Sequence, residues 1–292
     1  MKYILITVIL AVAFSGCTNN SNQSDAFGNF EAETVIVSSE SSGKILEMHI
    51  EKGQKIEAGS VTAIIDTMQL HLKLKQIQAQ KEAVAARRKT ISSQVAIFEE
   101  QKKNLQINKK RISKMLKDGA STQKQLDDIT GQIDVLDRQI ESTRTQYDPI
   151  SKELEVLEAQ KEITEDLIKS CTIKSPAEGT ILETYAEEGE LATPGKPLFK
   201  MAGLDELTLR VYVSGAQLPH IKTAQTVKVK VDKDETENQL FTGNVTWISS
   251  EAEFTPKIIQ TKEERVKLVY AVKIAVKNDG TLKIGMPGEV SW

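Results

Sequence analysis

Aromatic residues, histidine and cysteine are scarce in this chain of 292 residues, and each scarcity excludes something. Aromatics make up 5% and apolar residues 39%, which is little core material for a compact globule of this length. Charged residues reach 27%, so we expect elongated helices with a solvated surface. The 38 basic and 41 acidic residues are mixed along the chain, and without a basic block nothing indicates nucleic-acid binding.

Residues that carry chemistry are equally sparse, and they predict that the protein is not an enzyme. The histidines lie far apart, without a second ligand at the spacing of a metal site: His49, His71 and His220. No nucleophile elbow, phosphate-binding loop or dinucleotide motif is present. Adjacent acidic residues are interpreted as solvated surface: Glu99 with Glu100, Asp127 with Asp128, and Glu263 with Glu264. We therefore expect no catalytic residue, metal or cofactor.

The N-terminus has the pattern of an export signal. Lys2 gives a short positive region, and the apolar run from Ile4 to Phe14 is about half of the roughly 20 residues that a spanning helix needs. It ends in Phe14-Ser15-Gly16-Cys17, which resembles the lipobox of bacterial lipoproteins, with Phe14 where an aliphatic residue is usual. We expect removal of residues 1–16 and acylation of Cys17, which would anchor the chain to a membrane. The alternative is an ordinary signal peptide cut nearby, with Cys17 incidental.

Only one further cysteine exists, so a lipidated Cys17 leaves no intramolecular disulfide. Apolar neighbours predict that Cys171 is a small buried residue and not a reactive thiol. Residues 17–29 are rich in Asn, Ser and Gly with little to bury, and they predict a flexible tether between the membrane and the first domain.

Two segments punctuated by glycine repeat one another. The glycines follow intervals of ten and six residues in both copies: Gly43, Gly53 and Gly59, then Gly179, Gly189 and Gly195. An apolar position keeps the same spacing in both copies, since Ile45 and Ile181 each follow the first glycine by two residues. Short β-rich runs joined by tight glycine turns are typical of strands, and each copy is too small to stand alone. We expect the two copies to pair into one small β-sandwich.

Between the copies, apolar residues recur every seven positions, which indicates a coiled coil. The rows are Leu70, Ile77, Val84, Ile91, Phe98, Leu105 and Ile112, and then Leu126, Ile133, Ile140, Tyr147 and Leu154. The companion positions of the first arm also hold bases: Lys81, Arg88, Lys102 and Lys109. Each arm has roughly 50 residues, so at 1.5 Å per residue an antiparallel hairpin would reach about 75 Å.

The reversal between the arms is marked by capping residues. Gly119 is suited to the left-handed position that ends a helix. Thr122 is placed as the N-cap of the second helix, and Gln125 completes a capping box. Pro149 interrupts the second arm, but the seven-residue spacing continues across it, so we expect a kink and not a chain reversal.

From Leu204 onward, alternating apolar residues predict strands of a small antiparallel barrel. The alternating runs are Leu207–Val213, Val227–Val231, Thr242–Ile248 and Val269–Val276, with turn signals at Asn278-Asp279-Gly280 and Gly285-Met286-Pro287-Gly288.

This order of half-motif, hairpin, half-motif and barrel resembles the HlyD-type membrane fusion proteins, the periplasmic adaptors of export pumps. The resemblance covers nearly the whole mature chain, and the stretch from Phe254 to Gly288 looks like the barrel end of the adaptors that serve ABC-type exporters. It implies an elongated α+β fold, in which a long antiparallel coiled-coil hairpin is inserted in a split lipoyl-like β-sandwich and a small antiparallel β-barrel follows. The implied domains are a lipoprotein signal peptide (1–16), a tether (17–29), the first lipoyl-like half (30–66), the hairpin with its tip near 117–122 (67–170), the second half (171–203) and the barrel (204–292).

In this family the hairpin tip presents Arg, then Leu four residues later, then Ser or Thr seven further on, to the outer-membrane channel. Arg111, Met115 and Thr122 match that spacing around Gly119, with Met115 in place of the leucine. The resemblance thus implies docking through these residues. Without it, Arg111 is a solvated side chain, Met115 packs in the seam and Thr122 is only a cap.

The resemblance also implies the partners and the place of work. These are an inner-membrane transporter of the ABC type, a TolC-like outer-membrane channel and further copies of the chain in a hexamer. The protein would lie in the periplasm of a Gram-negative bacterium, lipid-anchored to the inner membrane. Because Trp292 follows directly after the barrel signature, we expect no further membrane-proximal domain.

Two other functions are compatible with parts of the sequence. True lipoyl domains carry a modified lysine at the hairpin between their halves, but here the long coil occupies that position, which argues against a swinging-arm carrier. A structural envelope lipoprotein that only tethers two layers would share the anchor and the coil. It would not need the split repeat or the spacing at the tip.

Overall fold

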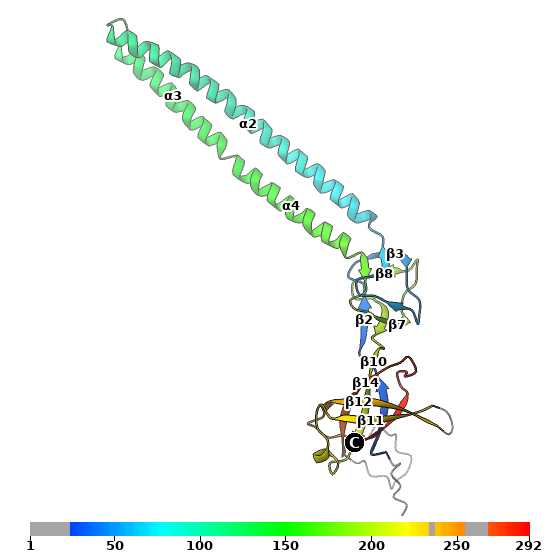
Figure 1. Ribbon diagram of the computed structural model, residues 1–292. Coiled ribbons are helices and arrows are strands. Elements are labelled where there is room, and N and C mark those ends of the chain that lie inside the picture. Colours follow the sequence, from blue (N-terminus) through cyan, green and yellow to red (C-terminus); the bar gives the residue numbers. More distant parts are fainter. Residues whose placement is uncertain (1–23, 234–236, 255–267) are drawn as a thin grey trace, which may run out of the picture.

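The computed structural model describes residues 24–233, 237–254 and 268–292. Three units follow one another along an elongated molecule: a helical hairpin, a β-sandwich at its base and a β-barrel at the far end (Figure 1). The α+β fold predicted from the sequence is confirmed, including the insertion of the hairpin between the two halves of the sandwich.

The sandwich is built from two interleaved copies of a four-stranded motif. The first copy is β2 (Thr34–Ser38), β3 (Gly43–Met48), β4 (Lys55–Ile56) and β5 (Val61–Ile65), and the second is β6 (Thr172–Lys174), β7 (Gly179–Thr184), β8 (Leu191–Ala192) and β9 (Pro197–Ala202). Its sheets have the orders β2-β9-β7-β4 and β6-β5-β3-β8, so each sheet takes strands from both copies. Neither copy forms a complete sheet by itself. Because the copies precede and follow the hairpin in the sequence, their pairing holds the two ends of the hairpin together.

Reciprocal hydrogen bonds confirm that the two copies are equivalent. The Gly53 N–H donates to the Ile181 carbonyl at 2.8 Å, and the Gly189 N–H donates to the Ile45 carbonyl at 2.9 Å. Both glycines have positive φ, 88° and 91°, a conformation that only glycine adopts at little cost. The equal glycine spacing in the sequence thus reflects a pseudo-twofold axis.

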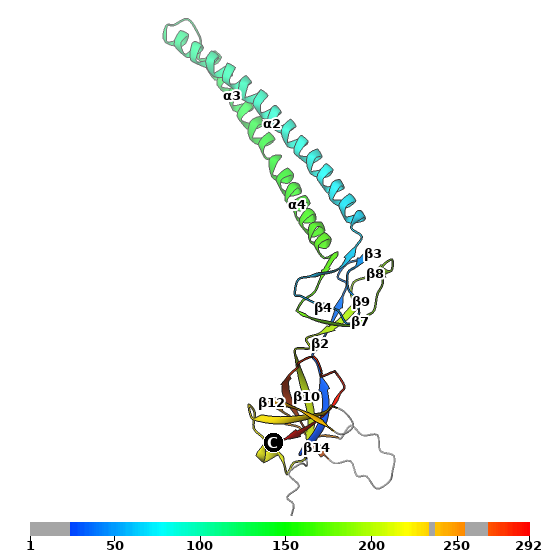
Figure 2. The same ribbon diagram turned by 45° about the vertical axis from the view of Figure 1, so that its right-hand side comes forward.

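The hairpin consists of α2 (Met68–Lys117) and an antiparallel arm made of α3 (Gln123–Arg144) and α4 (Tyr147–Lys169), side by side in Figures 1 and 2. The seam buries members of the predicted seven-residue rows together with apolar residues at the companion positions; the buried row members are Ile77, Val84, Ile133 and Ile140, and the buried companions are Val95, Ile129, Ile150 and Leu157. Two seam positions hold lysines whose side chains are only 24% and 28% exposed, Lys81 and Lys102. They pair across the seam with Glu158 and Asp137, so each lysine is matched by an acid of the opposite arm.

The second arm is interrupted but not reversed, as predicted. Helix α3 ends at Arg144 and α4 begins at Tyr147, while Thr145 and Gln146 keep right-handed helical dihedrals. Pro149 has no N–H to donate to the carbonyl of Thr145, and its ring crowds that carbonyl. The hydrogen-bond ladder therefore breaks one turn before the proline, and α4 continues along α2 (Figure 1).

The barrel closes through six antiparallel strands in the order β10-β1-β15-β11-β12-β14, with β14 returning to β10. Their bounds are β1 (Ala26–Glu31), β10 (Glu206–Val213), β11 (Thr226–Asp232), β12 (Asn238–Ile248), β14 (Leu268–Lys277) and β15 (Pro287–Ser291). The short helix η1 (Leu218–His220) follows β10, and β13 (Glu253–Phe254) extends one edge of β14. Alternate side chains fill the interior, among them Phe30, Leu209, Val229, Ile274 and Val290.

Strand β1 corrects the predicted tether. Residues 26–29 were expected to be flexible, but they belong to a strand that pairs with β10 and β15, and the sandwich begins at Thr34. Ala26 and Phe30 are buried in the barrel core, and a Cβ at Gly28 would lie 1.8 Å from the Arg210 carbonyl oxygen. The barrel therefore needs this N-terminal strand in addition to residues 204–292. The predicted signal peptide and Cys17 lie outside the described residues.

No helix within the described ranges is long and apolar enough to cross a bilayer.

Candidate docking site at the hairpin tip

The end of α2 is closed by a Schellman motif centred on Gly119. Gly119 has φ 72°, and its N–H donates to the Leu116 carbonyl at 3.1 Å. The Ala120 N–H donates to the Met115 carbonyl at 2.8 Å, which completes the pair of bonds that define the motif. The predicted helix end is confirmed, and the reversal is fixed at the point of the molecule farthest from the barrel (Figure 1).

Thr122 opens α3 with the predicted capping box. Its hydroxyl accepts a hydrogen bond from the Gln125 N–H at 3.3 Å, and the Gln125 side-chain oxygen accepts one from the Thr122 N–H at 3.1 Å. The hydroxyl of Ser121 donates to the same Gln125 oxygen at 2.7 Å. Two N–H groups that a helix start leaves without partners are thus satisfied within the turn, and the tip is ordered by its own side chains.

Arg111, Met115 and Gly119 are spaced four residues apart, so they line one face of the last two turns of α2 and the turn that follows. Met115 is 40% exposed and does not fill the seam. Arg111 is exposed and makes no ion pair with any residue in the described parts of the chain. The side chains of Arg111 and Met115 are therefore exposed to solvent, and Thr122 lies just across the reversal.

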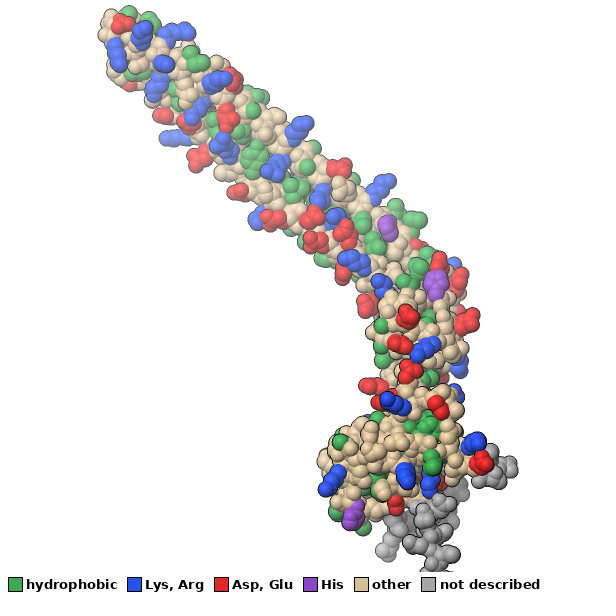
Figure 3. All heavy atoms as spheres, in the orientation of Figure 1, with side chains coloured by type: hydrophobic (Ala, Val, Ile, Leu, Met, Phe, Trp, Pro, Cys, Tyr) green, Lys and Arg blue, Asp and Glu red, His purple; other side chains and the backbone are tan. Residues whose placement is uncertain are grey.

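The tip also carries a surplus of positive charge, which the near-balanced charge of the whole chain conceals. Six bases within residues 109–124 form no ion pair among the described residues: Lys109, Lys110, Arg111, Lys114, Lys117 and Lys124. Lys and Arg side chains gather visibly at this end of the hairpin (Figure 3). The signal in the sequence was the change in charge balance, because only Asp118 lies among these bases.

The stem is different, because its charges pair between the two arms. Four ion pairs join them: Lys81–Glu158, Arg87–Glu153, Lys102–Asp137 and Glu99–Arg144. The hydrogen bond from Lys81 holds the pKa of the Glu158 carboxyl below its usual range. Ion pairs thus join the two arms along the stem, whereas none of the described ion pairs involves the six bases of the tip.

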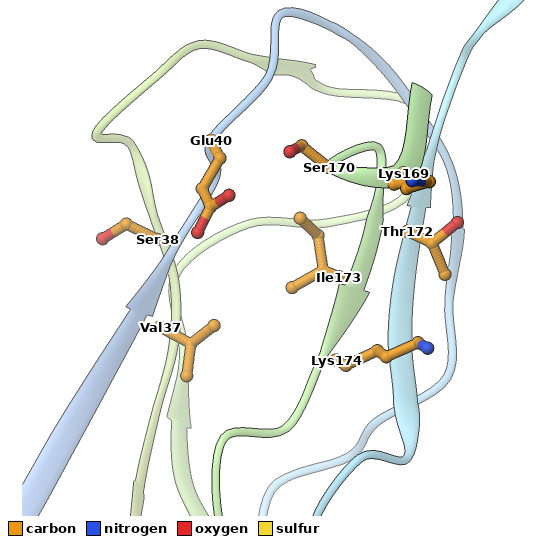
Figure 4. Close-up of a pocket in the computed structure, with 8 residues that line it drawn as sticks. All are labelled: Val37, Ser38, Glu40, Lys169, Ser170, Thr172, Ile173 and Lys174. Carbon is orange, nitrogen blue, oxygen red and sulfur yellow. The ribbon is translucent and has the colours of Figure 1, made fainter. Parts of the chain in front are cut away.

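A hollow lies at the other end of the hairpin, where β2 and β6 form free edges of the two sheets. It measures about 340 Å³ and is lined by Val37, Ser38, Glu40, Lys169, Ser170, Thr172, Ile173 and Lys174. Ile173 extends from β6 toward β2, and Lys174 points to the opposite side of the strand (Figure 4). Its charged residues are not buried, so the hollow lacks the enclosed polar groups of a built binding site.

Nearby Cys171 is fully buried, and its thiol donates to the Leu167 carbonyl at 3.3 Å, as predicted for a structural cysteine. In the part of the chain that the structure describes, no three His, Cys, Asp or Glu residues are grouped to hold a metal ion.

Known proteins share both halves of this architecture. Residues 33–202 match the family model of the RND MFP barrel-sandwich hybrid domain, and residues 204–292 match the LcnD-like C-terminal domain. The first match covers the whole sandwich and hairpin, including the tip.

Individual relatives are distant. The UPF0194 membrane protein from the asrC 5′ region of Acidithiobacillus ferridurans is 32% identical over 114 residues, which is 39% of this chain and 33% of that protein. The chain thus matches about a third of the length of this curated relative. The crystal structure of MacA from Actinobacillus actinomycetemcomitans is 20% identical with a TM-score of 0.57, covering 91% of this chain and 76% of that one. A putative efflux transporter from Bacteroides eggerthii has 16% identity and a TM-score of 0.53, covering 91% and 67%.

These structural likenesses show the fold, and the family model, which spans more than half of the chain, shows the family. The inserted hairpin, the interleaved sandwich and the closed barrel agree with it. The chain therefore belongs to the membrane fusion proteins, the family of periplasmic adaptors.

Proposed function

We propose that this protein joins an inner-membrane transporter of the ABC type to a TolC-like outer-membrane channel, for export of drugs or other substrates across the envelope. Membrane fusion adaptors are structural proteins, and this chain would act by coupling and sealing while the transporter hydrolyses nucleotide. The exposed face formed by Arg111, Met115 and Gly119 supports the proposal, because it lies at the far end of a long stem whose two arms are joined by ion pairs.

Lipidation at Cys17 would hold the barrel end at the inner membrane. Copies of the chain, six by resemblance to the family, would stand side by side, with sandwiches and barrels in a ring and hairpins in a tube. The tip is suited to reach a protein about 75 Å beyond the sandwich, since α2 has 50 residues at 1.5 Å each. A guanidinium there can bind carboxylates or carbonyls at a helix end of the channel.

Photocrosslinking in cells tests this function. A photoreactive residue at position 115 or 118 is expected to capture an outer-membrane channel protein. Capture only of peptidoglycan-associated proteins would instead favour an envelope tether that has no part in export.

A charge reversal tests the residue assignment. Arg111→Asp is expected to abolish channel capture and export, because it places an acid at the docking face without touching the seam. Arg138→Asp is the matched control, since Arg138 is also exposed and without an ion pair among the described residues but lies on the stem in α3. Normal export in the Arg111 variant would contradict the assignment.

A further inference from the structure

Three aromatic side chains lie on the outer wall of the barrel, although they come from distant parts of the chain. Phe27 of β1 pairs with Tyr212 of β10, Tyr212 pairs with Ala271 of β14, and the next outward residue of β14 pairs with Trp247 of β12. Phe27 is 58% exposed and Trp247 is 42% exposed. The four neighbouring strands thus carry an aromatic band, which we define as Phe27, Tyr212 and Trp247, on one side of the barrel.

Cationic side chains lie over two of these rings. The Arg210 guanidinium is 5.7 Å from the centre of the Tyr212 ring, and the Lys273 ammonium is 5.4 Å from the Trp247 ring. Tyrosine, tryptophan and long basic side chains combine an apolar body with a polar end. This combination concentrates where proteins meet the headgroup layer of a bilayer.

Two members of the band, Phe27 and Tyr212, lie near the end of the barrel that is farthest from the sandwich, and Trp247 lies one outward position closer to the sandwich, at the level of Arg210. β1 runs from Ala26 at that end toward β2, and β10 returns in the opposite direction (Figure 2). Phe27 and Tyr212 therefore lie close to the outer end. The exposed cross-strand pair Phe254 and Leu268, 72% and 59% accessible, occupies the same end of β14.

The position of the N-terminal segment indicates which surface this end of the barrel faces. The chain enters the structure at Ser24, and the seven Cα steps back to Cys17 can span at most about 25 Å. An acyl anchor on Cys17, or retention of the apolar run before it, would hold Ser24 within that distance of the bilayer surface. Phe27 is only three residues further along the chain.

We propose that the barrel rests on the phospholipid surface through this aromatic band, with the Phe27 and Trp247 rings in the headgroup layer. The anchor would then have a second, protein-made contact, which sets the orientation of the barrel and so of the hairpin. The proposal rests on the membrane anchorage proposed above and not on docking at the tip.

Charge contributes little to this contact. Arg210 is already held by both carboxylate oxygens of Glu253, at 2.7 and 3.0 Å, and Glu289 is the cross-strand neighbour of Phe27 on the outer wall. Among the residues that the structure describes, Lys273 is the base that remains near the band. The contact is therefore expected to form on zwitterionic as well as anionic lipid and to change little with salt, because screening acts only on charges.

The native tryptophans allow a direct test. The chain has two, and Trp292→Phe leaves Trp247 as the only reporter. This substitution is mild, because the Trp292 indole N–H has no hydrogen-bond partner among the described residues. The full lipidated chain is placed in phosphatidylcholine vesicles whose acyl chains are brominated close to the headgroup. Trp247 emission is expected to fall by about half relative to unbrominated vesicles, because the ring sits at the headgroup level.

Two exposed residues of the same barrel supply a variant and its control. Phe27→Ser is expected to remove most of the quenching, whereas Leu240→Ser is expected to leave it unchanged. Leu240 is 65% exposed but lies toward the opposite end of β12. Equal quenching in both variants would overturn the proposal.

The mass of the N-terminal peptide reports the anchor separately. A lipidated chain whose Trp247 is not quenched would overturn the lipid contact alone and leave the adaptor function intact. Shielding of Trp247 that appears only when transporter or further copies of the chain are added would also overturn it, in favour of a protein partner.

Discussion

At the scale of single residues, Gly119 and Gly131 differ in the backbone conformation that each position requires. Gly119 needs φ 72° to close the Schellman motif, whereas Gly131 lies inside α3 with open space where a side-chain methyl would stand. Gly119→Ala is expected to lower the free energy of unfolding of the hairpin by about 1–2 kcal/mol, the cost of a Cβ in the left-handed region. Gly131→Ala is expected to raise it by about 1 kcal/mol, because alanine is the better helix former.

Chemical denaturation followed by helical circular dichroism measures both changes. Each variant adds one methyl group to the same hairpin, so a common sign would show that methyl burial, and not backbone conformation, decides the outcome. If Gly119→Ala no longer captures the channel at a temperature where the hairpin is still folded, the shape of the turn is needed for docking.

At the scale of elements, lysines occupy seam positions of the hairpin where a coiled coil usually has apolar residues. Lys81 and Lys102 each find an acid on the opposite arm, and polar groups at seam positions specify the register of a coiled coil at some cost in stability. The sequence shows the lysines but not their partners. Which acid faces which base depends on how two arms joined by a tight turn align, and Glu158 is 77 residues from Lys81.

The Lys81–Glu158 pair gives the hairpin a dependence on pH. The lysine holds the Glu158 pKa below its usual range, so the pair stabilises the fold at neutral pH, and this contribution is lost as the pH falls below about 4. Wild type is therefore expected to melt at a higher temperature than Glu158→Gln at pH 7. The gap should close in acid, where the wild-type carboxyl is also neutral.

Melting curves of the two proteins across the acidic range check this, and Glu155→Gln serves as the control. Glu155 pairs with Lys152 of the same helix, and both side chains are largely exposed, so its replacement should matter less. A gap for Glu158→Gln that stays constant with pH would mean that packing, not charge, explains the difference.

At the scale of the whole molecule, local signals in the sequence predicted local structure well. The repeated glycine spacing predicted that two distant segments pair in a sandwich, seven-residue rows predicted the hairpin, and Gly119 with Thr122 predicted its reversal, because each of these signals is a pattern visible in the sequence. Strand β1 was missed, since its partners β10 and β15 follow more than 170 residues later and no repeated pattern in the sequence links them. The aromatic band escaped prediction for the same reason.

At the candidate site, too, some features could be predicted from the sequence and others could not. The spacing of Arg111, Met115 and Thr122 could be seen in the sequence, and the predicted capping role of Thr122 is confirmed. That Met115 lies on the surface and not in the seam could not be read from the sequence. At the end of a coiled coil the arms diverge into the turn, and the geometry of that turn decides which positions remain covered.

The length of the hairpin is the property of the whole molecule that the proposed function needs most. The ion pairs show that residues of the two arms face each other in matched order, with Lys102 opposite Asp137 and Glu99 opposite Arg144. Removing one heptad from each arm, residues 98–104 and 136–142, keeps the seam in register and leaves the tip untouched. The hairpin would be shorter by about 10 Å, since each residue contributes 1.5 Å.

This shortened chain is expected to fold, with helical content reduced only by the deleted residues, and its tip is expected to bind the purified channel as wild type does. Export in cells is expected to be lost, because the tip would no longer reach the channel while the barrel is held at the inner membrane. Circular dichroism, channel pull-down and an efflux assay separate these outcomes. Full export by the shortened chain would mean that the hairpin does not act as a spacer of fixed length. Only the docking residues at the tip would then support the bridging function.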